Sequence, residues 1–446
     1  MAENRPFNLL RCLKPAAWIA VLFLAGAGAL FLLAVENFGV LPRTLASYVE
    51  RRASGHNPSI VNLGHVIGKV LTALDRGSDQ DHGRSSLSLG FRYPDAAGSS
   101  TALRSEKIVF AASREDLLKA ILEARPGDVI TLRPGSYRFT GAYIDVNRSG
   151  TPAAGIMLRA ELPGTVFLEF DMEEGFLVSA AYWSFENLTI RGVCRRHPDC
   201  EHAFHVVTAA THFTARNNTI LDFNAHFKIN GSGRLAPDYG LIEGNTLRNT
   251  SVRRTDNPVA LIDLVAASHW RVRGNTISDF AKAGSDRTSY GAFAKGGGSD
   301  NRFEQNLVLC EHGLRNIAGA RVGISLGGGG TAREYCRDGQ CLAEQQGSVI
   351  ASNLIASCSD DGIYINRAAA SKIVHNTLID TGGIVVRDTE SSADIEGNLV
   401  DGAIRSRDGG TIRATDNIET AITRLYLGSH PVRALFRNRP SPSPLH

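Results

Sequence analysis

One lysine in this sequence stands where proton-transfer chemistry could take place. Lys295 ends an apolar segment in YGAFAKGGGSDNRFEQN and is followed by three glycines. Strict alternation from Phe293 would point Lys295 inward, where an unpaired ammonium is costly. The glycines at 296–298 favour instead a bulge that turns the side chain outward. A lysine presented in this way could act as a base toward a bound substrate.

Other polar side chains recur at equivalent places in a series of short apolar segments. These segments are HAFHVV, AHFKIN, VALIDL, GAFAKG, RVGISL, DGIYIN, GGIVVR and GAIRSR. Because side chains alternate along a strand, one set points away from the core. That set suits an acidic sugar polymer, since guanidinium groups bind carboxylates or sulfates in bidentate fashion. The predicted substrate-binding residues are His205, Lys228, Asn230, Asp263, Asn366, Arg387, Arg405 and Arg407, with Ser325 and Tyr364 on the same surface.

The elements that must position these residues form a repeat. Units such as RNNTI, EGNTL, RGNTI and EGNLV recur at intervals of roughly 19 to 31 residues, with one interval of about 47. Asparagine tolerates the left-handed backbone of a tight turn and can bond its counterpart in the next coil. A repeat of this length indicates a solenoid with an internal asparagine ladder. The predicted ladder residues are Asn187, Asn218, Asn245, Asn275, Asn306, Asn353, Asn376, Asn398 and Asn417.

The N-terminal segment has the composition of a membrane span. Residues 16–35, AAWIAVLFLAGAGALFLLAV, carry no charge and are long enough to cross a bilayer as a helix. Arg5, Arg11 and Lys14 precede this stretch, so the positive-inside rule places the N-terminus in the cytoplasm. A cleaved signal peptide is the alternative. The apolar run continues beyond the small residues that could be its processing site, which favours an uncleaved anchor.

The sequence divides into four regions. Residues 1–36 are the cytoplasmic stub and anchor, residues 37–106 a partly helical tether, residues 107–420 the solenoid, and residues 421–446 a C-terminal tail. Within the solenoid, Ser113 begins a helix with an apolar stripe. We expect this helix to cover the first coil, because an exposed parallel edge would aggregate.

Charge and cysteine content limit the function classes. A formal charge of +3 from 48 basic and 45 acidic residues is too weak a bias to indicate a nucleic-acid binder. The cysteines of CRRHPDC and of CRDGQC could each close a small loop in an oxidising compartment. Neither pair has the spacing of a zinc site. Cys310 and Cys358 occupy similar places in their repeats and are predicted to be stacked neighbours, bonded or free.

The cap and the repeat together resemble a known family. DLLKAILEARPGDVITLRPGSYRF, the following SGTPAAGIMLRA and the asparagine units resemble the right-handed parallel β-helix of the pectin-lyase-like superfamily. Within it, the sequence is similar to the chondroitinase B and alginate lyase group, polysaccharide lyase family 6. The resemblance covers about residues 107–418. It implies an all-β fold, a right-handed parallel β-helix with an N-terminal capping helix, preceded here by a single transmembrane helix.

The resemblance also implies roles for particular residues. In the family, a lysine at a similar strand end acts on the proton beside the uronate carboxylate, and Lys295 would take this role. β-Elimination further requires a cation that neutralises the carboxylate and an acid that protonates the leaving oxygen. We expect Arg315 or Arg321 as the cation and His312 or Tyr364 as the acid.

Two positions depart from the family pattern. The family's catalytic arginine follows the next strand, where this sequence has Leu326 and Gly327. In place of the carboxylates that hold calcium in the family, the segment DRTSYGAFAK offers only Asp286. The sequence therefore gives no support for calcium, and we predict no metal and no other cofactor.

These features predict a membrane-anchored protein that acts on an acidic polysaccharide, with lyase chemistry by β-elimination. Two alternatives remain. A uronate C5-epimerase would invert the same carbon without shortening the polymer, and a binding or export scaffold would use the same surface without turnover. The expected location is a bacterial inner membrane, crossed once, with the C-terminal domain in the periplasm. The expected partners are the polysaccharide, the membrane and the machinery of exopolysaccharide assembly, and not nucleic acid.

Overall fold

The structure is a computed structural model that describes residues 15–77, 107–231 and 235–437. It divides into two compact units. The first comprises Met1–Gly77 and Ala421–Ser429, and the second comprises Ser78–Thr420 and His430–His446. The second unit carries the predicted site.

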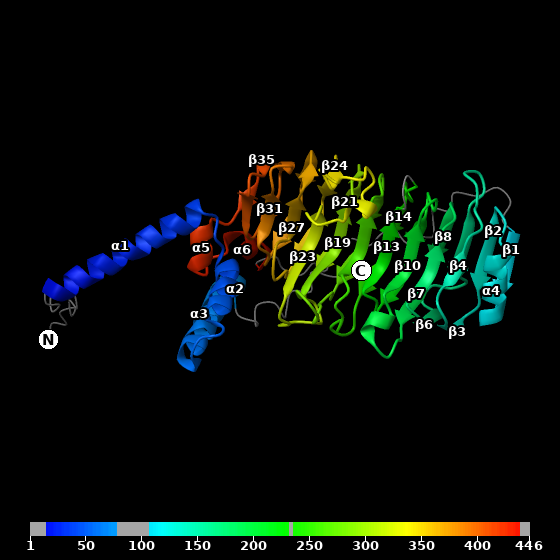
Figure 1. Cartoon of the computed structure of the whole chain (residues 1–446), viewed down its shortest axis with the longest axis horizontal. Helices are drawn as coiled ribbons and strands as arrows, with labels where there is room; N and C mark the ends of the chain where they lie inside the picture. Colours follow the sequence, from blue (N-terminus) through cyan, green and yellow to red (C-terminus); the bar gives the residue numbers. More distant parts are fainter. Residues whose placement is uncertain (1–14, 78–106, 232–234, 438–446) are drawn as a thin grey trace, which may run out of the picture. The chain divides into compact units, whose positions relative to one another are not determined.

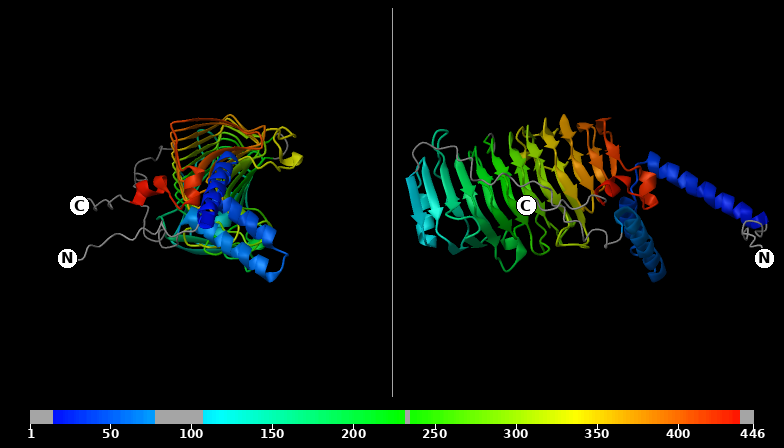
Figure 2. Two further views of the ribbon diagram at one scale, coloured as in Figure 1. Left: turned by 90° about the vertical axis from the view of Figure 1, so that its left-hand side faces the viewer. Right: turned by 180° about the vertical axis from the view of Figure 1, so that it is seen from behind.

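The second unit is a solenoid whose coils each contribute strands to three parallel sheets (Figure 1). Seen end-on in Figure 2, successive coils lie over one another. Sheet A consists of β1 (Lys107–Ala111), β2 (Asp128–Leu132), β5 (Ile156–Ala160), β8 (Trp183–Glu186), β11 (Thr214–Arg216), β14 (Leu241–Glu243), β17 (Arg271–Arg273), β21 (Arg302–Glu304), β25 (Val349–Ala351), β29 (Ser371–Val374), β32 (Ser392–Glu396) and β35 (Thr411–Thr415).

The other two sheets run beside it. Sheet B consists of β3 (Gly135–Thr140), β6 (Val166–Asp171), β9 (Thr189–Gly192), β12 (Thr219–Leu221), β15 (Thr246–Arg248), β18 (Thr276–Ser278), β22 (Leu307–Leu309), β26 (Leu354–Ala356), β30 (Thr377–Ile379), β33 (Leu399–Val400) and β36 (Ile418–Glu419). Sheet C consists of β4 (Ile144–Val146), β7 (Glu174–Val178), β10 (His202–Val207), β13 (Ala225–Asn230), β16 (Val259–Val265), β19 (Thr288–Lys295), β23 (Ala320–Leu326), β27 (Ile363–Asn366), β31 (Gly383–Arg387) and β34 (Ala403–Arg407). A small fourth sheet contains β20 (Gly298–Ser299), β24 (Gln345–Gln346) and β28 (Ala368–Ala369).

Apolar side chains from all three sheets fill the interior of the solenoid. In sheet C, Phe204 pairs in register with Phe227, which pairs with Ile262, and all three are fully buried. The rings of Phe204 and Phe227 stack with their centroids 5.3 Å apart. Burial of each such side chain favours folding by roughly 1.5–3 kcal/mol. The parallel β-helix predicted from the sequence is therefore confirmed.

An asparagine ladder joins the coils at the turn between sheets A and B. Asn218 donates a side-chain N–H to Asn245 Oδ1 at 3.0 Å, and Asn245 donates to Asn275 Oδ1 at the same distance. Asn245 also donates to the carbonyl of Ala215 at 3.0 Å, so both of its amide hydrogens are bonded. The ladder continues through Asn306, Asn353, Asn376, Asn398 and Asn417.

Two details of the predicted ladder are wrong. Asn187 lies one position too early, and Leu188 takes the equivalent place, where its backbone N–H donates to Asn218 Oδ1 at 3.0 Å. The left-handed residue is the one before each ladder asparagine, as at Asn217 with φ 53° and Gly244 with φ 66°. The preceding residue makes the turn, so the asparagine that follows is free to point inward.

Helix α4 (Arg114–Leu122) covers the first coil, as predicted (Figure 1). Ser113 Oγ accepts a hydrogen bond from the Asp116 N–H at 3.0 Å, and the Asp116 carboxylate accepts one from the Ser113 N–H at 3.1 Å. This reciprocal pair is a capping box, which fixes where the helix begins. Leu117 and Ile121 are buried on the other side of the helix.

The region assigned to a C-terminal tail contains two helices, α5 (Ile422–Tyr426) and α6 (Pro431–Arg437). In the second unit, Arg433 Nε donates to Asp401 Oδ2 at 2.6 Å, and His430 Nδ1 lies 3.0 Å from Asp401 Oδ1. Burial raises the pKa of Asp401, but its contacts with His430 and Arg433 hold that pKa below its usual range. The buried carboxylate thereby anchors α6 to the end of the solenoid. The end of the predicted tail, residues 438–446, lies outside the described residues.

The first unit contains α1 (Pro15–Asn37), α2 (Pro42–Ala53), α3 (Pro58–Arg76) and α5. Within α1, the segment Ala17–Asn37 is long and apolar enough to cross a membrane. Helices α2 and α3 pack against each other, and Arg43 Nη2 lies 2.8 Å from Asp75 Oδ1 in a buried ion pair. The predicted tether is thus helical up to Arg76, and its polar remainder lies outside the described residues.

Three disulfides stabilise the second unit. Two of them close the short loops predicted from the sequence. The third joins successive coils, and the sequence left open whether its two cysteines are bonded or free. The bonds are Cys194–Cys200, Cys336–Cys341 and Cys310–Cys358.

Removal of one ladder side chain should destabilise the solenoid. In Asn275→Ala, the side-chain and backbone N–H groups of Asn245 both lose their acceptor. Each buried polar group left without a partner costs about 1–3 kcal/mol. Urea denaturation should show this loss, whereas Lys372→Ala, an exposed change on sheet A, should leave the free energy of unfolding nearly unchanged. Equal stability of the two variants would contradict a structural role for the ladder.

Candidate functional site on sheet C

Register pairing aligns one outward side chain from each strand of sheet C. His205 pairs with Lys228, Lys228 with Asp263, and Asp263 with Phe293. The row continues through Ser325, Tyr364, Val385 and Arg405. Parallel strands lie about 4.8 Å apart, so side chains from distant parts of the sequence become neighbours. Six residues of the predicted surface thus lie in one row, although Asp263 and Ser325 are buried. The six are His205, Lys228, Asp263, Ser325, Tyr364 and Arg405.

Lys295 points outward without a bulge, so the predicted bulge is wrong. Gly291 and Ala292 both face the core, because a Cβ on Gly291 would contact Val308 and Phe280, and Ala292 is buried beside Ile262. Two consecutive inward positions shift the alternation by one residue. Phe293 and Lys295 consequently lie on the outer face.

Lys295 and Lys228 share one buried carboxylate. Lys228 Nζ lies 2.5 Å from Asp263 Oδ2, and Lys295 Nζ lies 4.0 Å from Asp263 Oδ1. The Lys295 ammonium also lies 4.5 Å from the centroid of the Phe293 ring. Although burial opposes the charged form, Lys228 and then Lys295 hold the pKa of Asp263 below its usual range. Asp263 is thus an anion that holds two cations at the surface.

A second polar group lies beside this pair of lysines. His205 Nδ1 lies 2.8 Å from Glu174 Oε1, and His205 Nε2 lies 2.6 Å from Asn230 Oδ1. Burial opposes ionisation of Glu174, but its contacts with His202 and His205 outweigh burial and lower its pKa to about 2. Burial lowers the pKa of His202. Glu174 is not predicted from the sequence, because its strand, EGFLV, precedes the first segment of the predicted series, HAFHVV.

The Gly-rich insertion after β23 is built around a buried carboxylate. Glu344 accepts hydrogen bonds from the Gly328 N–H at 2.9 Å and from the Thr331 N–H and hydroxyl at 3.0 Å. A Cβ on Gly328 would lie 2.6 Å from the Phe293 ring. The glycines therefore let the loop approach Phe293, which in turn contacts Lys295. This gives the glycine run a structural role.

An arginine from the same insertion reaches the end of β19, but its charge is already paired. The Arg337 N–H donates to the carbonyl of Gly296 at 2.9 Å. Its guanidinium binds both oxygens of Asp238 at 2.7 and 2.8 Å. Leu326 and Gly327, at the position of the family's arginine, are a buried core residue and a turn residue with φ 70°.

Three predicted catalytic residues do not lie near Lys295. Arg321 pairs in register with Ser289, six residues before Lys295 on β19, which is on the order of 20 Å along an extended strand. Arg321 is fully buried and bonds Glu311 through Nε at 2.7 Å, so it has a structural role. Arg315 and His312 lie on the preceding loop, where Arg315 Nε donates to the His312 carbonyl at 2.9 Å.

The remaining predicted residues form a separate group near the C-terminal end of sheet C. Arg387 Nη1 donates to Tyr364 Oη at 3.3 Å, and Arg387 Nε donates to Asp408 Oδ2 at 2.6 Å. Arg405 Nη2 binds Asp361 Oδ1 at 2.9 Å. Arg407 is exposed, whereas Asn366 is nearly buried. The positive charges of Arg387 and Arg405 are therefore partly neutralised by neighbouring carboxylates.

Tyr290 is a further residue that sequence reasoning missed. Tyr290 lies three residues before Phe293 on β19, and the two rings stack with their centroids 4.4 Å apart. Burial, and then the nearby Tyr364, raise the pKa of Tyr290 above its usual range. The hydroxyl therefore stays protonated and can donate a proton.

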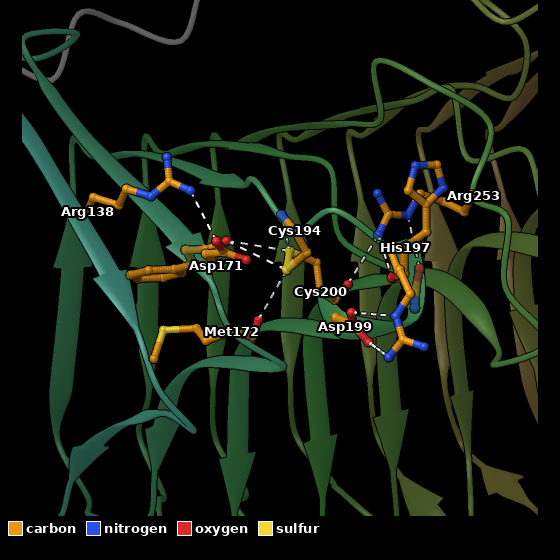
Figure 3. The surroundings of a disulfide bond; sticks show 11 residues. Arg138, Asp171, Met172, Cys194, His197, Asp199, Cys200 and Arg253 are labelled. Atoms are coloured by element: carbon orange, nitrogen blue, oxygen red, sulfur yellow. Dashed lines mark hydrogen bonds and ion pairs between the residues drawn. A yellow bond between two sulfur atoms is a disulfide. The ribbon is translucent and has the colours of Figure 1, made fainter.

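A cavity lies on the loops before the strands of sheet C, away from the lysines. It has a volume of about 810 Å³, beside the Cys194–Cys200 disulfide. Figure 3 shows this disulfide with Arg253, which donates to the carbonyls of His197 and Cys200 at 2.9 and 3.3 Å. Burial, then Arg253 and Arg254, lower the pKa of His197. The lining residues include Arg195, Arg196, His197, Thr250, Arg254 and Leu314.

Comparisons with known proteins find similarity to solved structures at low sequence identity. No protein-family model and no curated protein matches the sequence. Solved structures that are similar to this chain include pectate lyase Pel9A, with 16% identity over 70% of this chain and 80% of that chain at a TM-score of 0.48. An alginate lyase from Paenibacillus sp. str. FPU-7 shows 15% identity over 70% and 99%, with a TM-score of 0.42. The PL6 polysaccharide lyase Pedsa3628 from Pseudopedobacter saltans shows 13% identity over 70% and 92%, with a TM-score of 0.40.

The parallel β-helix of this chain is established by its own three stacked parallel sheets. At such identities the likeness concerns the fold alone. The roles of individual side chains have to come from the contacts within this chain.

Asp263→Asn should destabilise the folded chain at neutral pH. The change removes the charge that holds Lys228 and Lys295, and loss of one partner of a buried ion pair costs about 3 kcal/mol. The folded pKa of Asp263 is lowered, so its carboxylate stabilises the fold above the unfolded pKa of about 3.9. That contribution disappears as the pH falls through the folded pKa.

Urea denaturation of the wild type and the variant from neutral to acid pH measures this difference. The difference should be largest at neutral pH and should close in acid. Asp300→Asn, at an exposed carboxylate, serves as the control. A difference that stays constant down to the lowest pH would refute the linkage.

Proposed function

We propose that the solenoid binds an acidic, uronate-containing polysaccharide along the outer face of sheet C and cleaves it by β-elimination at Lys295. The observation that supports this proposal is the pair of outward lysines on either side of Asp263. Two neighbouring ammonium groups suit a polymer with repeated carboxylates better than a neutral glycan. The cationic cavity on the adjacent loops extends the surface available to an anionic chain.

The reaction assigns one role to each of three side chains. Lys228 pairs with the uronate carboxylate, which makes the C5 proton easier to remove. In this proposal Lys295 first gives its own proton to solvent and then takes the C5 proton. The electron pair forms the C4–C5 double bond as the C4–O bond breaks. Tyr290, whose ring stacks on the Phe293 ring beside Lys295, keeps its phenolic proton and gives it to the leaving oxygen.

One observation favours a second function, polysaccharide binding without turnover. The Lys295 ammonium contacts the Asp263 carboxylate and the Phe293 ring, and both contacts are favourable to a positive charge. The place of the family's arginine is taken by Leu326 and Gly327. A scaffold for binding or export would need these cations only to hold the polymer.

The proposed location follows from the first unit and from the cysteines. Helix α1 would hold the protein in a bacterial inner membrane, with the basic residues before it on the cytoplasmic side. The three disulfides suit an oxidising compartment, so the solenoid would lie in the periplasm. There it could act on a polysaccharide during export, together with exopolysaccharide assembly proteins.

The full chain in detergent tests this proposal with alginate, chondroitin sulfate and polygalacturonate. Cleavage by elimination should give unsaturated products that absorb in the ultraviolet. Lys295→Ala should abolish this absorbance, because the base is lost, while Lys372→Ala on sheet A should retain it.

Other outcomes separate the remaining functions. Binding of a polymer that needs Lys228 but yields no product would support the scaffold. Inversion at C5 seen by NMR, without shortening of the polymer, would identify an epimerase. Neither binding nor product with any of the three polymers would reject an acidic polysaccharide as the ligand.

A further inference from the structure

Two histidines and a glutamate converge at the beginning of β10. Glu174 lies on β7, and His202 and His205 lie on the neighbouring β10. One ligand atom from each of the three residues lies within 4.8 Å of the others. Glu174 Oε1 is 2.8 Å from His205 Nδ1 and 3.7 Å from His202 Nδ1. In a tetrahedral site with metal–ligand bonds of about 2.1 Å, ligand atoms lie about 3.4 Å apart, between these two values.

The second nitrogen of each ring faces an oxygen. His205 Nε2 lies 2.6 Å from Asn230 Oδ1, and His202 Nε2 lies 3.7 Å from Glu201 Oε1. Histidine ligands of metals usually donate their other N–H to a carbonyl or carboxylate, which fixes the tautomer and the ring orientation. Asn230 and Glu201 are placed to do this for the two rings.

Hydrogen bonds alone, without a metal, leave one ring nitrogen of this cluster without a partner. A chain from Glu174 through His205 to Asn230 accounts for His205. Among the described residues, however, His202 Nδ1 is a buried nitrogen without a hydrogen-bond partner. The His202 side chain is only 12% exposed, so this nitrogen has little access to solvent. A metal ion between the three residues would satisfy it.

We propose that Glu174, His202 and His205 bind a divalent transition-metal ion of the zinc type. Two imidazoles and one carboxylate are the ligands of catalytic zinc sites, which keep a further position open. Calcium prefers oxygen ligands and would not select two histidines. His205 is the pairing partner of Lys228, so the ion would lie on the same outer face of sheet C as the lysines. The proposal does not depend on whether the chain cleaves a polysaccharide.

Metal binding by the full chain in detergent tests this site. Protein purified without a histidine tag and treated with a chelator should bind about one zinc ion per chain by calorimetry, and excess calcium should not compete. Cobalt at the same site should give visible absorption bands. His205→Gln and Glu174→Gln, which preserve size, should each weaken zinc binding by more than about 100-fold.

Two further variants separate the site from nonspecific binding. Asn230→Ala keeps all three ligands and should weaken affinity by about 10-fold to 100-fold. His212→Gln should leave it unchanged, because His212 stacks between Tyr182 and Tyr239 on another turn. Circular dichroism checks that each variant is folded.

The proposal is overturned by any of three results. These are a wild-type chain that binds no zinc, ligand variants that bind as tightly as the wild type, or a His212→Gln variant that loses zinc to the same extent. If one ligand variant does not fold, the other decides, and the cobalt spectrum of the wild type reports directly on nitrogen ligation.

Discussion

The register between successive coils is the constraint on which the rest of this structure depends. Backbone hydrogen bonds hold each inner strand of sheet C against two neighbours. The ladder that includes Asn218 and Asn245 fixes the turn on which that register depends. Equivalent side chains are thereby held about 4.8 Å apart. Lys228 and Asp263, 35 residues apart in sequence, become an ion pair for this reason alone.

The same register also determines which basic side chains are already paired with a carboxylate and which can bind a ligand. The basic residues that recur in the sequence suggest a positively charged surface. Stacking of the coils, however, also places carboxylates next to these basic residues. Arg405 binds Asp361, Arg387 binds Asp408, and Arg337 binds Asp238. A polymer that binds here must therefore meet cations that are already oriented by intramolecular partners. Such orientation reduces the entropy lost when a carboxylate binds.

The sequence predicted those features that repeat or that depend on neighbouring residues. The coils, the capping helix after Ser113 and the two short disulfide loops are of this kind. Features that depend on other coils were not predictable. The outward direction of Phe293 follows from two consecutive inward residues, which alternation does not reveal, and the contact of Arg337 with Asp238 spans 99 positions. Arg321 does not lie near Lys295 as predicted, because residues that are close in sequence can lie far apart on the sheet.

The position of Lys295 depends on a series of contacts that begins inside the insertion. The buried Glu344 carboxylate holds the backbone of Gly328, and Gly328 has no side chain that would collide with Phe293. Phe293 can therefore occupy its place on the outer face, where its ring lies beside the ammonium of Lys295. Asp263 restrains the same ammonium from the neighbouring coil. The insertion and the strand register thus both restrain the Lys295 side chain. Such restraint is expected where a lysine must be presented to a ligand in one orientation.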